Sequence, residues 1–499
     1  MEAVSKGAFT TNRKSYLQTI NDVVKNGIYR DTWESLFQYE VPKWYQDAKF
    51  GIFIHWGVYS VPAFGSEWYP HDMYVKGSPQ YEHHLKTYGS HKKFGYRDFI
   101  PMFHGESFDP DAWAELFRRS GAKYVIPVSE HHDGFQMYRS ELSHYNSYEM
   151  GPHRDVAGEM KKALESRGLI YGASSHRIEH WFYFGHGKEF DSDVREPLTP
   201  SDLYWPAMPE PDHLDLFSPA PSREFLEDWL LRTCEIVDRY HPKVMYFDWW
   251  IQHSAVKPYL KKFAAYYYNR AREWGEEVAI NYKQDGMMFG SGVVDMERGQ
   301  FAEAKPYFWQ TDTSVADNSW GYTTDNKYKT ASEILCTLAD TVSKNGCLLL
   351  NIGPRADGTI PEKEQEILRE IGDWMETNGE AIYGCRVWRK AEEGPTKTVE
   401  GQFMEGEMKP FTSRDIRFTV NGSSVYAIFL KCPDNGVFHI ESLGERDAMK
   451  LPHFHGIIRD VSVLGFPGKP TWKRTGQELT VEAPSVRSDK PVVLKVLVD

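Results

Sequence analysis

The chain has 499 residues, which is too long for one small hydrophobic core, so two domains are expected. Its net charge of -13 argues against a nucleic-acid partner, because such proteins need a basic face to neutralise phosphates. The hydrophobic fraction of 41% is that of a globular protein, and no apolar run is long enough to cross a membrane.

The N-terminus and the cysteines bear on the cellular compartment. The first residues, MEAVSKGAFTTNRK, lack the apolar core of a signal peptide, so a cytoplasmic location is expected. A secreted or periplasmic protein whose leader has been trimmed would look the same. An odd, scattered set of cysteines without a CxxC pair indicates reduced, buried thiols rather than disulfides or a zinc site. They are Cys234, Cys336, Cys347, Cys385 and Cys432.

Short apolar runs recur through the first 355 residues and predict strands buried on both faces, as in a parallel sheet. They span residues 49–56, 123–132, 169–176, 244–250, 277–283, 306–312 and 347–354. Amphipathic helices lie between several of them, one beginning at Asp109-Pro110 and another at Ser222. This alternation predicts an α/β fold, a (β/α)8-like TIM barrel. The eighth strand is expected among the tyrosine-rich segments and long loops.

Almost every predicted strand ends in a residue that can do chemistry. In a barrel, the carboxyl ends of the strands form the catalytic face, so these side chains are expected to converge there. They are His55, His131, His132, His176, Asp248, Lys283, Asp312 and Asn351.

The pattern changes near residue 390, after a predicted helix that follows Pro361. Residues 391–402, AEEGPTKTVEGQ, are polar and typical of a linker. Alternating apolar and polar runs then flank Asn421-Gly422, a strong signal for a β-hairpin. The expected organisation is a catalytic barrel over residues 1–389 and an antiparallel β-sandwich over residues 390–499.

Asp248 is the strongest candidate for a catalytic carboxylate. A glycosidase that retains configuration needs two carboxyl groups roughly 5–5.5 Å apart, one as nucleophile and one as acid/base. Asp248 follows an apolar strand and precedes Trp249 and Trp250, so it would project between aromatic rings. From this segment alone, an aspartate that caps the next helix is equally compatible.

Seven blocks of sequence point to one family. The longest are KFGIFIHWGVYSVPAFGSEWY (49–69), SEHHDGF (129–135) and VSKNGCLLLNIGPRADGTIPE (342–362). The others are GPHRD (151–155), FDWW (247–250), SWGY (319–322) and NGEAIYG (378–384). Taken in chain order across residues 35–390, the seven blocks resemble the α-L-fucosidases of glycoside hydrolase family 29. The resemblance implies a retaining exo-acting enzyme that removes terminal fucose from fucosylated glycans and uses no metal or other cofactor. Members of the family range from tolerant enzymes to ones restricted to branched α-1,3/1,4 linkages, and tolerance of several linkages is the expectation for this chain.

The resemblance also implies roles for individual residues. Asp248 matches the nucleophile at the end of the fourth strand. Residues that match those holding the fucose hydroxyls are His55, Glu67, Trp68, His131 and His132. Lys283 stands near a position where relatives often carry an arginine that faces the sugar, and is expected to bind it as a point charge. Candidates for the apolar wall beside the fucose methyl group are Phe53, Trp249, Trp250 and Trp320.

Three segments leave alternatives open. Relatives place the acid/base glutamate in a variable loop after the strand at 277–283, where Glu297 is the nearest match and Asp295 and Glu303 are rivals. Adjacent side chains on a strand point to opposite faces, so one of the histidines at 131–132 is expected to serve the fold. The segment SSHRIEHW (174–181) either shapes the leaving-group side or is a solvated loop.

Other classes of function also have to be weighed. A metal-dependent hydrolase could use EHHD (130–133), although adjacent histidines lack the usual spacing of zinc ligands. A lectin without turnover would keep the pocket, and the presence of Asp248 argues against it. A barrel glycosidase for another sugar would need the matches at His55, Trp68 and His131 to be accidental. Nothing in the sequence indicates the oligomeric state or the role of the sandwich.

Overall fold

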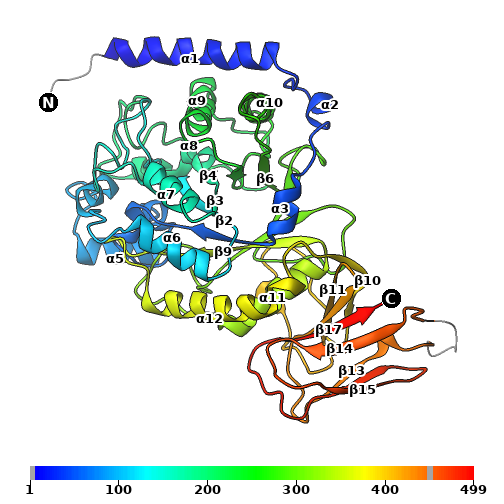
Figure 1. Ribbon diagram of the computed structural model, residues 1–499. Coiled ribbons are helices and arrows are strands. Elements are labelled where there is room, and N and C mark those ends of the chain that lie inside the picture. Colours follow the sequence, from blue (N-terminus) through cyan, green and yellow to red (C-terminus); the bar gives the residue numbers. More distant parts are fainter. Residues whose placement is uncertain (1–5, 447–452) are drawn as a thin grey trace.

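Nine parallel strands form a sheet that closes on itself in the upper part of Figure 1. The computed structural model describes residues 6–446 and 453–499. The strands of this sheet are β1 (Phe50–Ile54), β2 (Tyr124–Glu130), β3 (Ile170–Tyr171), β4 (Ala173–Ser175), β5 (Val244–Phe247), β6 (Ala279–Lys283), β7 (Val293–Glu297), β8 (Trp309–Ser314) and β9 (Gly346–Ile352).

Closure of the barrel depends on β1, which pairs in parallel with both β2 and β9. The strand order is β1-β9-β8-β7-β6-β5-β4-β2-β3, and the β1–β2 pairing joins the ends. Both β3 and β4 pair with β2 and are separated only by Gly172, so together they occupy one of eight positions. The predicted TIM barrel is therefore confirmed.

The eighth strand is β7, which the sequence pattern did not reveal. Two of its five residues, Asp295 and Glu297, are acidic and interrupt the apolar run. It is nevertheless almost wholly buried and pairs with β6 and β8. Glu297 consequently ends a barrel strand, which corrects the expectation that it lies in a variable loop.

Helices cover most of the outside of the barrel. The long ones after α1 are α6 (Pro110–Arg119), α7 (Val156–Glu165), α9 (Arg223–Tyr240), α10 (Lys257–Trp274), α11 (Ala331–Ser343) and α12 (Glu362–Asn378). As predicted, Asp109 and Ser222 cap α6 and α9, each accepting a hydrogen bond from a backbone N–H of the first turn. Within the described residues, β6, β7 and β8 follow one another without an intervening helix.

One long helix and several short ones lie before the barrel and in its loops. Helix α1 (Lys6–Asn26) lies across the outside of the barrel near α9 and α10 (Figure 1). The others are α2 (Trp33–Leu36), α3 (Lys43–Ala48), α4 (Tyr69–Asp72), α5 (Pro79–Thr87) and α8 (His180–Tyr183). Single 3-10 turns occur at Val58–Ser60, Tyr96–Met102, Arg177–Glu179, Gly185–Glu189, Gly379–Ala381, Glu405–Glu407 and Glu441–Leu443.

The C-terminal domain consists of two antiparallel sheets below the barrel in Figure 1. Their orders are β10-β11-β12-β17-β14 and β13-β16-β15. The strands are β10 (Arg386–Glu393), β11 (Ile416–Asn421), β12 (Ser424–Phe429), β13 (Val437–Ile440), β14 (Ile458–Val463), β15 (Thr471–Arg474), β16 (Leu479–Glu482) and β17 (Val492–Val498). The predicted hairpin is present, with Asn421 opposite Ser424 and Gly422 at a φ of 55°.

The segment expected to be a linker is part of both domains. Strand β10 begins at Arg386 and already includes residues 391–393. Further on, Glu400 and Gly401 form bridges with Gln300, just beyond β7. Residues 391–402 therefore run from the sandwich back to the barrel.

The five cysteines are all buried and unpaired, as their scattered positions predicted. Burial raises the pKa of the Cys347 and Cys336 thiols to about 12, so neither ionises near neutral pH. Within the ranges 6–446 and 453–499, every helix is too short or too polar to span a membrane.

Candidate active site

The carboxyl ends of the barrel strands surround a cavity of about 250 Å³. This volume lies below the roughly 300–1,000 Å³ of pockets for drug-sized ligands, so the cavity suits a single small ring. Eight of the nine residues predicted for the site line it, and Lys283 does not. The lining residues are Phe53, His55, Glu67, Trp68, His131, His132, His176, Glu179, Tyr246, Asp248, Trp249, Glu297, Asp312, Trp320 and Phe403.

Asp248 directly follows β5 and reaches the cavity as an ionised carboxylate. Its Oδ2 atom lies 2.8 Å from Nδ1 of His176 and 3.5 Å from Nε2 of His132. Its Oδ1 accepts a hydrogen bond of 2.9 Å from the backbone N–H of Trp249. Burial opposes ionisation, but His176 and the Lys283 ammonium hold the pKa of Asp248 well below its usual range.

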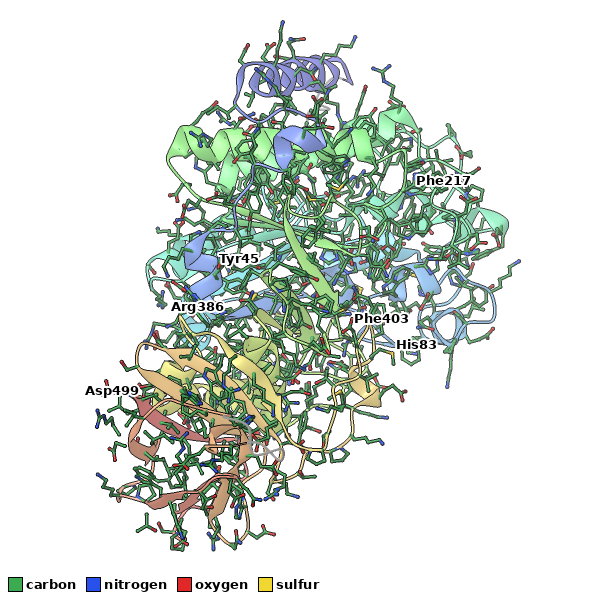
Figure 2. All side chains as sticks on the ribbon, turned by 90° about the vertical axis from the view of Figure 1, so that its right-hand side faces the viewer. Tyr45, His83, Phe217, Arg386, Phe403 and Asp499 are labelled. Carbon is green, nitrogen blue, oxygen red and sulfur yellow. The ribbon has the colours of Figure 1, made fainter. Side chains whose placement is uncertain are left out.

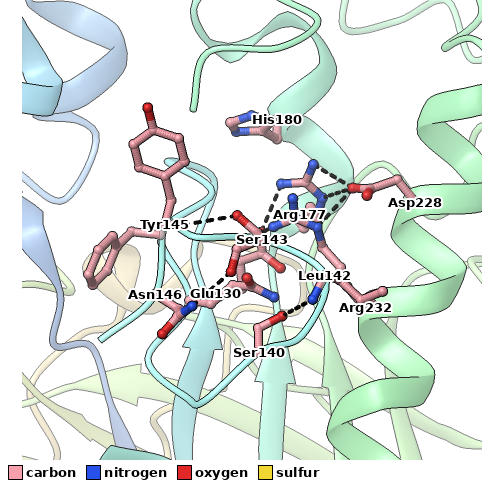
Figure 3. A network of polar contacts seen from close by, with 12 residues as sticks. Glu130, Ser140, Leu142, Ser143, Tyr145, Asn146, Arg177, His180, Asp228 and Arg232 are labelled. Carbon is pink, nitrogen blue, oxygen red and sulfur yellow. Dashed lines mark hydrogen bonds and ion pairs between the residues drawn. The ribbon is translucent and has the colours of Figure 1, made fainter. Parts of the chain in front are cut away.

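A buried ion network holds His176 in place. Figure 3 shows Arg177 and Arg232 between Glu130, on β2, and Asp228, on α9. Arg177 contacts Glu130 at 2.8 Å and Asp228 at 2.7 Å, and Arg232 contacts them at 2.9 and 2.8 Å. Because Arg177 follows His176 directly, this network fixes the end of β4. Residues 174–181 are buried throughout, so the solvated-loop interpretation of this segment was wrong.

Glu297 is another carboxyl group of the cavity, and its pKa is shifted in the opposite direction from that of Asp248. Its Oε2 accepts a hydrogen bond of 2.6 Å from the indole N–H of Trp249. Burial, with the nearby charges of Asp248 and Asp312, raises the pKa of Glu297 to about 7, while Lys283 acts against the rise. Trp249 therefore contacts both carboxyl groups, one through its backbone and the other through its ring.

Lys283 lies beneath the cavity, which corrects the expectation that it binds the sugar. Its side chain is fully buried, and its Nζ contacts Asp295 at 2.5 Å, both Asp312 oxygens at 3.1 Å and Glu297 at 3.3 Å. These carboxyl oxygens use all the donors of the ammonium group. Lys283 thus acts as their counter-ion and has no donor left for a hydroxyl group.

The rivals of Glu297 lie outside the cavity lining. Asp295 points into the buried cluster, where its second oxygen accepts a hydrogen bond from Gln310 at 2.6 Å. Glu303 is exposed beyond the end of β7. The structure instead adds Glu179, whose pKa is raised well above its usual value by burial and by Asp248 and Glu297.

Glu67 and His55 have fixed partners. Glu67 Oε2 accepts hydrogen bonds from the Ser319 hydroxyl at 3.0 Å and from the backbone N–H of Trp320 at 2.9 Å. His55 Nδ1 lies 2.7 Å from the side-chain oxygen of Asn351. Burial lowers the pKa of His55 well below its usual value, so its ring is neutral and its free nitrogen can serve a hydroxyl group.

Both histidines of the 131–132 pair line the cavity, contrary to the expectation that one faces away. Strand β2 ends at Glu130, so the pair lies beyond it and strand alternation does not apply. His132 Nδ1 bonds to the backbone oxygen of His176 at 2.8 Å, whereas His131 Nδ1 is buried and has no hydrogen-bond partner among the described residues. Burial lowers the pKa of His132 to about 3 and that of His131 well below its usual range.

The aromatic candidates separate by position. Phe53, Trp249 and Trp320 line the cavity, and Trp68 lies on the side of His132 with ring centroids 5.2 Å apart. Trp250 does not line it, because its side chain packs under Phe182, 5.2 Å between centroids. Phe403, from the C-terminal domain, had no signal in the sequence that linked it to the site.

The histidines also form groups with the geometry of a metal site. Ring nitrogens of His55, His131 and His176 lie within 4.8 Å of one another, as do the ligand atoms of His132, His176 and Asp248. The three imidazoles come from different strands, which adjacent residues in the sequence did not reveal. Chelation, rather than the spacing of the ligands in the sequence, therefore decides the metal-dependent alternative.

A barrel whose small cavity is walled by imidazole and aromatic rings, and holds two carboxyl groups with pKa values shifted in opposite directions, has the arrangement of a glycoside hydrolase. Comparison with known proteins gives the family. Residues 16–380 match the profile described as Alpha-L-fucosidase, and residues 409–496 match the profile described as Alpha-L-fucosidase C-terminal domain. The chain therefore belongs to the α-L-fucosidases of glycoside hydrolase family 29.

Individual relatives are similar over nearly their whole length. The chain is 34% identical to tissue alpha-L-fucosidase of Homo sapiens, covering 89% of this chain and 85% of that protein. It is 31% identical to alpha-L-fucosidase of Branchiostoma floridae over 93% of each chain. The solved structure of Thermotoga maritima alpha-fucosidase has a TM-score of 0.71 at 31% identity, covering 94% of this chain and 100% of that one.

Proposed function

We propose that this enzyme is a retaining exo-α-L-fucosidase in which Asp248 is the nucleophile and Glu297 the acid/base. One observation carries the proposal. The pKa of Asp248 is held low while that of Glu297 is raised to about 7, and the two share a cavity and a contact with Trp249. Such a divergence assigns the roles of base and acid to two carboxyl groups.

In the first step, a carboxylate oxygen of Asp248 forms a bond to the anomeric carbon of fucose. The glycosidic C–O bond breaks, and its electron pair goes to the leaving oxygen, which takes the proton of Glu297. The leaving alcohol departs neutral, and fucose remains as an ester of Asp248.

In the second step, water attacks the anomeric carbon, and the bond to Asp248 breaks. Glu297 takes the proton of the water. The ester has no charge, so the repulsion that raised the pKa of Glu297 is gone and the group becomes a base when one is needed. Two inversions retain the α configuration.

The small size of the cavity supports action on a terminal residue, since its volume of about 250 Å³ accommodates one ring. Structures of the Thermotoga maritima enzyme in complex with fucose and with a mechanism-based inhibitor support the choice of sugar. Fucosylated oligosaccharides or glycoconjugates are then the substrates. Tolerance of several linkages is part of the proposal.

The proposed test follows the first-formed product by NMR. Aryl α-L-fucoside should be hydrolysed to α-fucose before mutarotation, whereas aryl galactosides should be left intact. A panel of fucosylated oligosaccharides should yield fucose from more than one linkage. Appearance of β-fucose first would establish inversion and recast Asp248 as a general base.

The neutral imidazoles of His55 and His131 are proposed to hydrogen-bond the hydroxyls of fucose. Replacing either with Ala should weaken fucose as a competitive inhibitor by about 1–3 kcal/mol, because buried polar groups lose a partner. Exposed His213 provides a control, and His213→Ala should leave the inhibition constant unchanged.

Activity should survive exhaustive chelation, and the protein should hold no stoichiometric zinc. One zinc per chain, with activity lost on chelation and restored by the metal, would favour the metal-dependent hydrolase.

A further inference from the structure

A segment of the C-terminal domain, residues 399–408, lies against the end of β7. We call it the return segment. Glu400 and Gly401 form bridges with Gln300, and the backbone N–H of Glu405 donates to the oxygen of Arg298 at 2.9 Å. Figure 2 shows Phe403 where the C-terminal domain meets the barrel, far from Asp499. The return segment thus packs beside the end of β7, the strand end that carries Glu297.

Glu405 anchors the return segment through charge. Its carboxylate contacts Arg298 at 2.8 Å and Lys329 at 3.2 Å, and it accepts a hydrogen bond of 2.6 Å from the hydroxyl of Thr313 on β8. Burial opposes ionisation, but Lys329 and Arg298 keep the pKa of Glu405 below its usual value. The segment is therefore bonded to both β7 and β8.

Gln402 and its neighbour bond to the backbone of Glu297 itself. The side-chain oxygen of Gln402 accepts a hydrogen bond from the backbone N–H of Glu297. The backbone N–H of Phe403 donates to the backbone oxygen of Glu297 at 2.8 Å. The amide nitrogen of Gln402 also donates to the oxygen of Asp295 at 3.3 Å. Both backbone polar groups of Glu297 consequently depend on a residue more than a hundred positions later.

Phe403 lines the cavity although 55% of it is exposed. Its φ of 60° lies in the left-handed region, which a bulky residue adopts only when its surroundings enforce it. Its ring stacks with Trp249 at a centroid distance of 5.9 Å and an interplanar angle of 21°. Trp249 in turn donates to Glu297, so the two rings form a wall beside that carboxyl group.

We propose that Phe403 and Trp249 form the surface on which the leaving sugar packs, and that Gln402 is a positioning residue for Glu297. The inference rests on the proposed acid/base role of Glu297, since the group that protonates the leaving oxygen must lie beside the leaving group. Flat, partly exposed rings match the C–H face of a pyranose. The sandwich domain would then supply part of the catalytic cavity.

The wall is tested with two substrates that differ only in the leaving group. α-L-Fucosyl fluoride releases fluoride, which touches no ring, whereas a fucosyl-galactose disaccharide releases a pyranose. Phe403→Ala should lower kcat/KM for the disaccharide about tenfold, a loss of about 1.4 kcal/mol, and change that for the fluoride less than about twofold. Phe403→Trp should restore kcat/KM for the disaccharide.

Phe37 is the matched control, an aromatic residue of similar exposure (63%) that is absent from the cavity lining. Phe37→Ala should leave both substrates unchanged. Equal losses on both substrates in Phe403→Ala would overturn the wall, since the ring would then act on the fold or on fucose. No loss on the disaccharide would also overturn it.

The positioning role of Gln402 is tested by a pH profile. Gln402→Glu keeps the acceptor for the Glu297 N–H and adds a negative charge, which should raise the pKa of Glu297 and move the basic limb of kcat/KM to higher pH. Glu407→Gln changes the charge at an exposed position of the same segment and should not move this limb.

An unmoved limb in Gln402→Glu would overturn the positioning role. Failure of the acid/base assignment would look different, because the basic limb would then survive in Glu297→Ala. The comparison of fluoride and disaccharide in Phe403→Ala does not depend on which group titrates.

Discussion

Asp248→Ala is expected to lower turnover on the order of 10⁴-fold or more, the largest effect of any single substitution in this enzyme. In the proposed mechanism the variant has no group to form the fucosyl ester, and direct attack of water has to cross the barrier in one step. The substitution also leaves the His176 ring and the backbone N–H of Trp249 without the carboxylate that both contact. Steady-state kinetics with an aryl fucoside measures the loss.

Azide gives the diagnostic for this variant. A small anion can occupy the space of the missing carboxylate, so added azide should partly restore release of the aryl group. Asp285→Ala, at an exposed position after β6, is the matched control and should keep full turnover. Near-normal turnover of Asp248→Ala would exclude it as the nucleophile.

Glu297→Ala should have the second largest effect, and its size should depend on the leaving group. Natural fucosides release a sugar alcohol that leaves poorly without a proton, so their hydrolysis should almost cease. A nitrophenyl fucoside releases a stable anion and should lose much less in the first step. Single-turnover rates of the wild type and Glu297→Ala on both substrates give the loss for each leaving group, and the two losses can then be compared.

The pH profile carries the same information. In the proposed mechanism Glu297 must be protonated in the first step, so wild-type kcat/KM should fall as pH rises through its pKa of about 7. This basic limb should vanish in Glu297→Ala. Glu179→Ala and Glu303→Ala are the comparisons, one inside the cavity and one outside it. If only one of these variants shows the dependence on leaving group, the acid/base assignment passes to that residue.

The barrel was largely predictable because its strands are buried on both faces and so read as apolar runs. Strand β7 was not, since a strand containing Asp295 and Glu297 looks like a loop until its partner is known. That partner is Lys283, which neutralises the cluster from the end of β6. The apolar pattern of a single strand shows where a buried charge would be costly. It does not show that a lysine on the neighbouring strand offsets that cost.

The candidate site was predictable where residues end strands, as with His55 and Asp248. The prediction failed for residues whose position in the site depends on contacts between distant segments of the chain. Glu179 and Phe403 both line the cavity, but the sequence singled out only the segment around Glu179 and nothing near Phe403. Lys283 was misplaced for the opposite reason: it does end a strand, but it points to the interior of the barrel, where the three carboxyl groups bind it.

Because β1 pairs with both β2 and β9, closure of the barrel has to wait until β9 has been synthesised. Phe50 and Leu348 are partners about 300 residues apart, which at roughly 5–20 residues per second corresponds to a delay on the order of 15–60 s. Throughout that time one edge of β1, whose five residues are all buried in the finished enzyme, has no partner. The ring closes only once β9 emerges, and Glu297 receives its backbone contacts later still, when Gln402 leaves the ribosome. An unpaired strand edge favours aggregation, so the nascent barrel carries this liability until β9 emerges, and the contacts that hold the backbone of Glu297 form only after the barrel has closed.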